Sequence, residues 1–94
     1  MDLIKVSATS RTAAVAGAIA GVIRDRQRAE VQAIGAGAVN QAVKALILAT
    51  GYLREEGIHV YCVPEFADVT IEDKVRTAIK LVIELRHSPG PAQD

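Results

Sequence analysis

The segment VQAIGAGAVNQAVKALILA, residues 31–49, decides how this chain folds. Its apolar start is typical of a strand, Gly35 and Gly37 mark a tight turn, and apolar residues then recur at helical spacing. Glycines let the main chain pass close to a partner, and the unpaired amides of a first helical turn point outward with the positive end of the helix dipole. The turn is therefore a candidate anion site. The polar residues near the start of the helix are Asn40, Gln41 and Lys44.

A purely structural role for the glycines is the main alternative, because such a turn also brings a helix close to a sheet. Neither nucleotide-binding signature is complete: GAGAVN, residues 35–40, has Asn40 where G-x-G-x-x-G requires glycine, and no G-K-[ST] sequence follows. We therefore expect no cofactor. A small-metabolite or phosphate sensor at this turn stays open as a further reading.

The residues before this segment predict a strand at 3–6, a polar loop with sequence SATS, and a helix that starts near Arg11. Thr9 or Ser10 is the expected N-cap of that helix. The helix ends in the sequence RDRQR, residues 24–28, where cations favour the negative end of the dipole. Its expected inward stripe is Val15, Ile19, Val22 and Ile23.

The second strand is expected at 31–34, and the second helix is expected to weaken at Gly51. A third strand over 58–63 continues through 66–71, with Pro64 marking an interruption or an edge position. After a polar turn, residues 75–86 alternate with a period of two, the clearest strand pattern in the chain. The expected inward face of the second helix is Val39, Ala42, Val43, Leu46 and Ile47.

This order, strand, helix, strand, helix, strand, strand, predicts an α+β fold in two layers. The first two strands run parallel, the last two form a hairpin, and both helices cover one face of a mixed four-stranded sheet. The other face has no helix to cover it and would expose apolar side chains. Those side chains are Ala78, Val82, Tyr61 and Val63, and we expect the chain to self-associate through them.

The bulk properties fit one domain, over residues 1–86, followed by a flexible tail over 87–94. Eleven basic and eleven acidic residues cancel, so no global field draws the protein to nucleic acid or membrane. No apolar run reaches the roughly 18 residues of a spanning helix. The single Cys62 suits a reducing compartment, and we expect a cytoplasmic protein without a membrane partner.

Catalysis has little support in the sequence. His59 and Cys62 are three apart on a predicted strand and so face opposite sides, which removes them as a nucleophile and base. No Cys/His cluster has metal-ligand spacing. Glu65 and Asp68 read as solvated loop carboxylates. We expect no enzyme, no catalytic residue and no metal.

The chain as a whole resembles the stage V sporulation protein S family of bacteria. Three stretches carry the likeness: LIKVSATSRTAAVAGAIAGVIRDR, AEVQAIGAGAVNQAVKALILA and RTAIKLVIELR. Together they cover nearly everything from residue 2 to residue 86. The resemblance implies a non-enzymatic regulator of bacterial development, related to sporulation.

The central segment also resembles Alba, a small nucleic-acid-binding protein of archaea and eukaryotes, at residues 38–43, AVNQAV. That resemblance implies an Alba-like sheet order of 1-2-4-3 and a homodimer or higher homo-oligomer. Gln41 replaces the lysine of the Alba motif and Gly37 replaces an arginine, so two expected phosphate contacts are missing.

The leading hypothesis is weak or context-dependent binding of DNA or RNA. Backbone amides and Asn or Gln side chains can position phosphates without net charge. The alternative is a protein adaptor that uses the uncovered sheet face and makes no contact with nucleic acid. The candidate nucleic-acid-binding residues are Ser10, Arg11, Gly35, Gly37, Asn40, Gln41, Lys44, Lys74 and Arg76.

Overall fold

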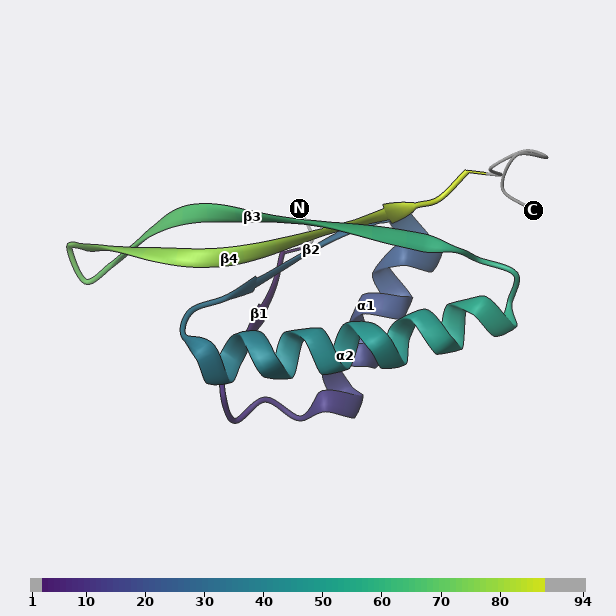
Figure 1. The fold of residues 1–94 in the computed structure, drawn as a ribbon, viewed down its shortest axis with the longest axis horizontal. Coiled ribbons are helices and arrows are strands. Elements are labelled where there is room, and N and C mark those ends of the chain that lie inside the picture. The colour runs from purple at the N-terminus through teal and green to yellow at the C-terminus, as the bar shows by residue number, and fades with distance from the viewer. Residues whose placement is uncertain (1–2, 88–94) are drawn as a thin grey trace.

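The computed structural model describes residues 3–87 of the chain and shows a two-layer α+β fold. The elements are β1 (Leu3–Val6), α1 (Thr12–Arg26), β2 (Arg28–Ala33), α2 (Ala36–Glu55), β3 (Val60–Ile71) and β4 (Lys74–Leu85). The four-stranded sheet has the order β1-β2-β4-β3, with β1 and β2 parallel and the other neighbours antiparallel. Both helices lie on one face of it (Figure 1). The predicted fold class and sheet order are confirmed, whereas the predicted tail lies outside the described residues except for His87.

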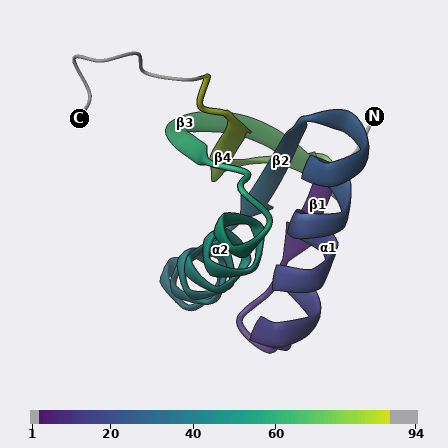
Figure 2. The ribbon, with the colours of Figure 1, turned by 90° about the vertical axis from the view of Figure 1, so that its right-hand side faces the viewer.

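The inward face of α2 is a stripe of alanines, which corrects the sequence prediction. Val43 and Ile47 were expected to face inward, yet they are 41% and 64% exposed. Alanine has no side chain beyond Cβ, so an alanine stripe lets α1 and α2 pack side by side under the sheet, as Figure 2 shows. The helix also continues through Gly51 to Glu55. The buried residues of α2 are Ala38, Ala42, Ala45, Ala49 and Leu53.

The start of α1 also differs from the prediction. Its N-cap is Arg11, and no side chain caps the helix. The hydroxyl of Ser10, expected to be a cap, instead accepts a hydrogen bond of 2.8 Å from the backbone N–H of Ser7. The 7–10 loop therefore uses its own hydroxyl groups to close its turn.

The two C-terminal strands form a long hairpin that extends beyond the body of the sheet. β2 pairs with β4 only as far as Ala33 opposite Ile79. Residues 67–71 and 74–78 pair only with each other, and we call this two-stranded projection the hairpin arm (Figure 1, left). Its tip is a tight turn in which Glu72 and Asp73 have φ of 51° and 65°, the conformation that two-residue hairpin turns require. Pro64 lies within β3 at the sheet edge, as the sequence allowed.

The sheet face without helices carries charges rather than the expected apolar surface. Ala78 and Val82 were predicted to be exposed there, yet they are only 0% and 7% exposed. Longer charged side chains stand in register on the same side: Arg28 contacts Glu30 at 2.6 Å and Glu84 at 2.9 Å. Lys80 bridges Glu30 at 3.6 Å and Glu65 at 3.8 Å, while Tyr61 and Val63 remain about half exposed. This face is an ion-pair network with apolar side chains beneath and beside it.

We predict that Glu84 controls the titration of Tyr61. The Tyr61 hydroxyl donates to Glu84 Oε1 at 3.0 Å, and this hydrogen bond raises the pKa of Tyr61 above its usual value. Glu84→Gln removes the negative charge, so the pKa of Tyr61 should fall towards that of a free tyrosine. Ultraviolet absorbance of tyrosinate against pH measures the shift. Glu65→Gln on the same face is the control and should leave the curve unchanged.

Candidate nucleic-acid interface

The loop between β1 and α1 is tied to the start of α2. The Gln41 side chain donates to the backbone oxygen of Ser10 at 2.8 Å and to the Thr12 hydroxyl at 3.2 Å. A Cβ added at Gly37 would lie 3.0 Å from the Cβ of Ala8, so the absence of a side chain permits this close approach. Three of the predicted site residues, Ser10, Gly37 and Gln41, are thus brought together. The Gln41 amide positions the loop, a role that the sequence did not indicate.

The first turn of α2 is covered on one side and open on the other. Gly35 is its N-cap, with φ 92° and ψ 157°, and no side chain caps the helix. Ala8 lies against Gly37, whereas a Cβ added at Gly35 would have no atom within 4 Å apart from its chain neighbours. Asn40 and, one turn later, Lys44 are both exposed. The exposed backbone of residues 35–37 and these two side chains remain accessible to a ligand.

We predict that Gly35→Ala destabilises the protein by about 1–3 kcal/mol. The backbone of Gly35 lies in a region that only glycine adopts readily, and a Cβ there adds strain without any new contact. Gly51→Ala is the matched control: Gly51 lies within α2 and has open space for an added Cβ, so alanine should stabilise by about 0.5–1 kcal/mol. Urea unfolding measures both changes. Equal effects of the two substitutions would contradict the assigned role of Gly35.

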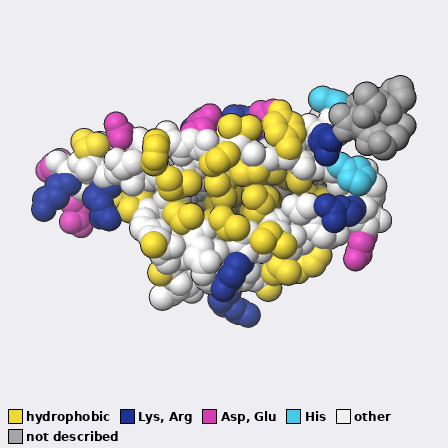
Figure 3. Space-filling view, viewed as in Figure 1, with side chains coloured by type: hydrophobic (Ala, Val, Ile, Leu, Met, Phe, Trp, Pro, Cys, Tyr) yellow, Lys and Arg dark blue, Asp and Glu magenta, His cyan; other side chains and the backbone are white. Residues whose placement is uncertain are grey.

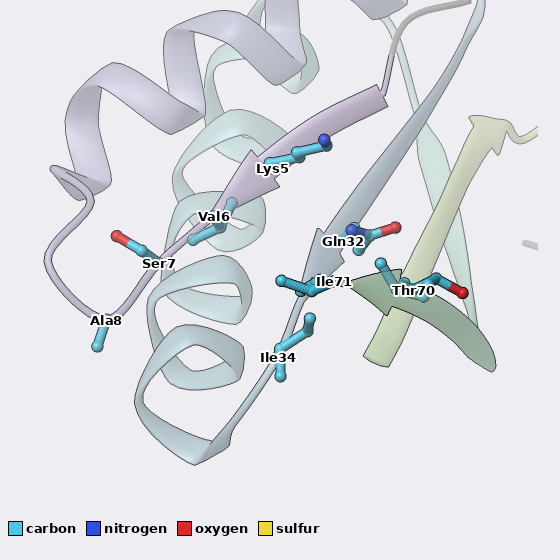
Figure 4. A pocket seen from close by; sticks show the side chains of 9 residues that line it. Lys5, Val6, Ser7, Ala8, Gln32, Ile34, Thr70 and Ile71 are labelled. Carbon is cyan, nitrogen blue, oxygen red and sulfur yellow. The ribbon is translucent and has the colours of Figure 1, made fainter. Parts of the chain in front are cut away.

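A cleft of about 350 Å³ opens where β1 and β2 end and β3 passes them; we call it the end cleft. Lys5 and Gln32, paired in register on neighbouring strands, line one part of it. Ile34 and Ile71 line another part, and Figure 4 shows their side chains close together. The complete lining is Lys5, Val6, Ser7, Ala8, Gln32, Ile34, Val69, Thr70 and Ile71.

The end cleft connects the two groups of predicted site residues. Ser7 and Ala8, from the loop that Gln41 holds, form one side of the cleft. The hairpin arm forms the other side, and its cations Lys74 and Arg76 pair in register with Ile71 and Val69 of the cleft lining. A ligand at this end of the molecule could therefore contact the loop and the arm at once.

The zero net charge conceals an uneven distribution of unpaired charges. Arg24 pairs with Glu56 at 2.6 Å, and Arg28 and Lys80 are held in the network on the open sheet face. Within residues 3–87, several other cations have no acidic partner within ion-pair distance. At the end of the molecule that holds the cleft these are Lys5, Arg11, Lys44, Lys74 and Arg76. Asp68, Glu72 and Asp73 on the arm reduce this local positive charge.

Sequence reasoning missed Lys5 and Gln32. The alternation of the first strand indicates that Lys5 lies on the face of the sheet opposite to that of buried Val6. Its proximity to Gln32, 27 residues later in the chain, depends on the parallel pairing of β1 with β2. Residues 69–71 line the other side of the cleft, and they reach it only because the β3–β4 hairpin is long. No local motif signals this combination.

Residues 3–87 show no side-chain arrangement typical of a metal site or of a nucleophile with its base. Within that range no cluster of three or more His, Cys, Asp or Glu side chains is placed to hold a metal ion. Partial burial raises the pKa of the Cys62 thiol, which makes it a poor nucleophile, and His59 lies just before β3. No helix in the described part of the chain has the length and apolar character needed to cross a membrane.

Comparison with known families identifies the relationship of the chain. The family model described as Stage V sporulation protein S matches residues 2–86. This match covers both helices and all four strands. The chain belongs to this family, which implies a sporulation-related role.

Proposed function

We propose that this member of the Stage V sporulation protein S family acts in the cytoplasm as a non-enzymatic regulator that binds nucleic acid at the end cleft. The observation that carries the proposal is the grouping of unpaired cations around a cleft that has a loop on one side and a projecting arm on the other. Two-stranded arms can reach along a groove of nucleic acid, and loop amides can contact the backbone. The likeness to Alba proteins supports the same choice of ligand.

The charges predict weak binding that depends strongly on salt. Each phosphate contact releases counterions, so the slope of log K against log salt is about −0.9 per contact for duplex DNA. Lys5 lines the cleft, and Lys74 and Arg76 lie on the arm in register with lining residues. Arg11 follows the 7–10 loop as the N-cap of α1, and Lys44 lies farther along α2. A slope of roughly −3 to −4 is the expected result for contact with most of them. Base readout is expected to contribute little to duplex binding.

Titration of labelled DNA and RNA, each as a single strand and as a duplex, tests this proposal. Fluorescence anisotropy at low salt should show binding in the micromolar range, which weakens as salt is raised. The absence of any binding at roughly 100 µM protein, the weak limit of non-specific affinity, would contradict the proposal. Binding that does not change with salt would also contradict it, because the cations then make no contact.

A second proposal concerns a partner protein, and one surface favours it. Figure 3 shows hydrophobic side chains gathered in a continuous area between β3 and α2. Val43 and Ile47 of α2 are 41% and 64% exposed, and Phe66 of β3 is 80% exposed. We call this surface the apolar flank; Pro64 and Leu46 also contribute to it through shallow pockets. The homo-oligomer expected from the sequence therefore has a more suitable interface here than on the charged sheet face.

We propose that a second copy of the chain covers the apolar flank. Phe66 and Ile47 are the most exposed side chains of the flank, and each lines a shallow pocket. A two-fold axis can place such side chains of one copy against the pockets of the other. A symmetric pair has to bury about 1,000 Å² in total to reach the lower limit for a specific interface. Equal numbers of acidic and basic residues mean that two copies do not repel each other.

Pro64 argues against the simplest other route to a dimer. An exposed edge strand can add a strand from a second copy, but proline lacks the amide that such pairing needs. Because Pro64 lies in the middle of the edge strand β3, contact through side chains is the better route. An adaptor would place a different protein on the flank. Purified protein that remains monomeric at high concentration would favour that alternative over self-association.

A further inference from the structure

We infer that the end cleft receives an unpaired base, so that the protein prefers single-stranded nucleic acid to a duplex. The inference rests on the proposed function and assigns a substrate class to the same site. It is carried by the residues that line the cleft. The side chains of Ile34, Val69 and Ile71 form an apolar wall, and the same lining contains the Gln32 amide and the Lys5 ammonium group, neither of which has a partner among the described residues. A duplex offers no partner for this combination, whereas an unstacked nucleotide offers one for each part.

The apolar wall is made of side chains at the ends of strands that do not belong to the hydrophobic core. Ile34 lies just beyond β2, and Val69 and Ile71 lie on the hairpin arm, where neither helix packs against them. Ile71 is 41% exposed. In a duplex the faces of the bases are stacked on each other, so only edges and backbone are available for contact. Apolar side chains gain most from a base whose face is free.

Gln32 supplies the polar group that such a base requires. Its side chain is half-buried in the cleft, and within residues 3–87 its amide has no hydrogen-bond partner. An amide has one acceptor and two donors, and it can pair with the edge of a base. Ordinary surface glutamines meet water in every direction. This one lies between Lys5 and Lys80 in the register of the sheet, with the apolar wall beside it.

Lys5 is placed for the phosphate next to the base. It pairs in register with Gln32 and has no acidic partner among the described residues, whereas Lys80 on the other side is held by Glu30 and Glu65. The volume of about 350 Å³ is at the small end of ligand pockets, which span roughly 300 to 1,000 Å³. The cleft therefore has space for one nucleotide. Single-stranded DNA and single-stranded RNA share the required chemistry.

The test compares wild type with Gln32→Met, which keeps the length of the side chain and removes its hydrogen bonds. Labelled single-stranded DNA, single-stranded RNA and the matching duplexes are titrated at low salt. We expect wild type to bind at least one single strand more tightly than its duplex. Gln32→Met should lose about five- to tenfold affinity for the single strand, the effect of one or two hydrogen bonds, and should keep its duplex affinity.

Two controls separate a local effect from a general one. Arg54→Gln removes an unpaired cation at the far end of α2 and should leave the preference for single strands unchanged. Thermal unfolding of Gln32→Met establishes that the variant folds as wild type does. Equal affinity for single strand and duplex, or an equal loss for both in Gln32→Met, would overturn the inference and leave the proposed function intact. No binding of any nucleic acid would overturn both.

Discussion

Replacing Lys74 and Arg76 together with alanine is expected to weaken duplex binding about tenfold or more at low salt. Both cations lie on the hairpin arm in register with residues that line the end cleft, and neither has an acidic partner within the described residues. Each phosphate contact that is lost should reduce the slope of log K against log salt by about 0.9. The slope of the double variant should therefore be smaller by about two. Fluorescence anisotropy over a range of salt concentrations measures both quantities.

The control is a substitution at the same tip that removes a negative charge instead of positive ones. Asp73 sits in the turn of the arm with φ 65°, a conformation that asparagine also accepts, so Asp73→Asn removes a negative charge without strain. It should strengthen binding, because it reduces repulsion of phosphate. The arm lies outside the hydrophobic core, so the free energy of unfolding should change by less than about 0.5 kcal/mol in each variant. A double alanine variant that keeps the wild-type salt slope would show that the arm does not contact phosphate.

Ile47→Asp is expected to abolish self-association. Ile47 is the most exposed side chain of α2 on the apolar flank, and in the proposed dimer it would be covered by the second copy. Burying an unpaired carboxylate at the centre of an interface is strongly unfavourable. The dissociation constant of the dimer should rise about 100-fold or more, and sedimentation velocity should show a monomer at concentrations where wild type is a dimer.

Leu48→Asp is the matched control for this effect. Leu48 is the next residue of α2 and is 39% exposed, but it lies about 100° further around the helix axis than Ile47 and is not part of the apolar flank. The control should reduce the stability of the monomer no less than Ile47→Asp does and should leave the dimer intact. Thermal unfolding at low and high protein concentration separates stability from association. Wild-type protein that sediments as a monomer throughout would contradict the proposed interface.

The predicted site was only partly recoverable from local sequence. Local sequence predicts that Gly35, Asn40 and Lys44 lie at a turn and the start of a helix, because one short stretch contains the strand, the glycine turn and the helix, and the structure shows all three residues exposed there. Gln41 was predicted to present a free amide to a ligand, but in the structure its amide donates a hydrogen bond to the backbone oxygen of Ser10. Lys5 and Gln32 were missed because each is an ordinary polar residue on a strand until the strands are paired.

The error at α2 has a different physical origin. Val43 and Ile47 are more hydrophobic than alanine, so a prediction that buries the most apolar face of the helix places them in the core. The distance between the two helices decides otherwise: they pack side by side under the sheet, and Ala42, Ala45 and Ala49 are fully buried. The larger side chains are displaced to the flank, where they create the surface proposed for the second copy.

By itself, the sequence determined the order of the elements, the α+β class and the hairpin, because hydrophobic periodicity and turn residues act over a few neighbouring positions. Its extended likeness to the Stage V sporulation protein S family indicated a sporulation-related role. The likeness of residues 38–43 to Alba predicted the sheet order, which the structure confirms. Only the tertiary structure decided which side of α2 is buried, which cations are free and where the cleft lies. These features depend on residues far apart in the sequence, such as Lys5, Gln32 and Ile71, which strand pairing brings to one cleft. No local sequence pattern encodes that arrangement.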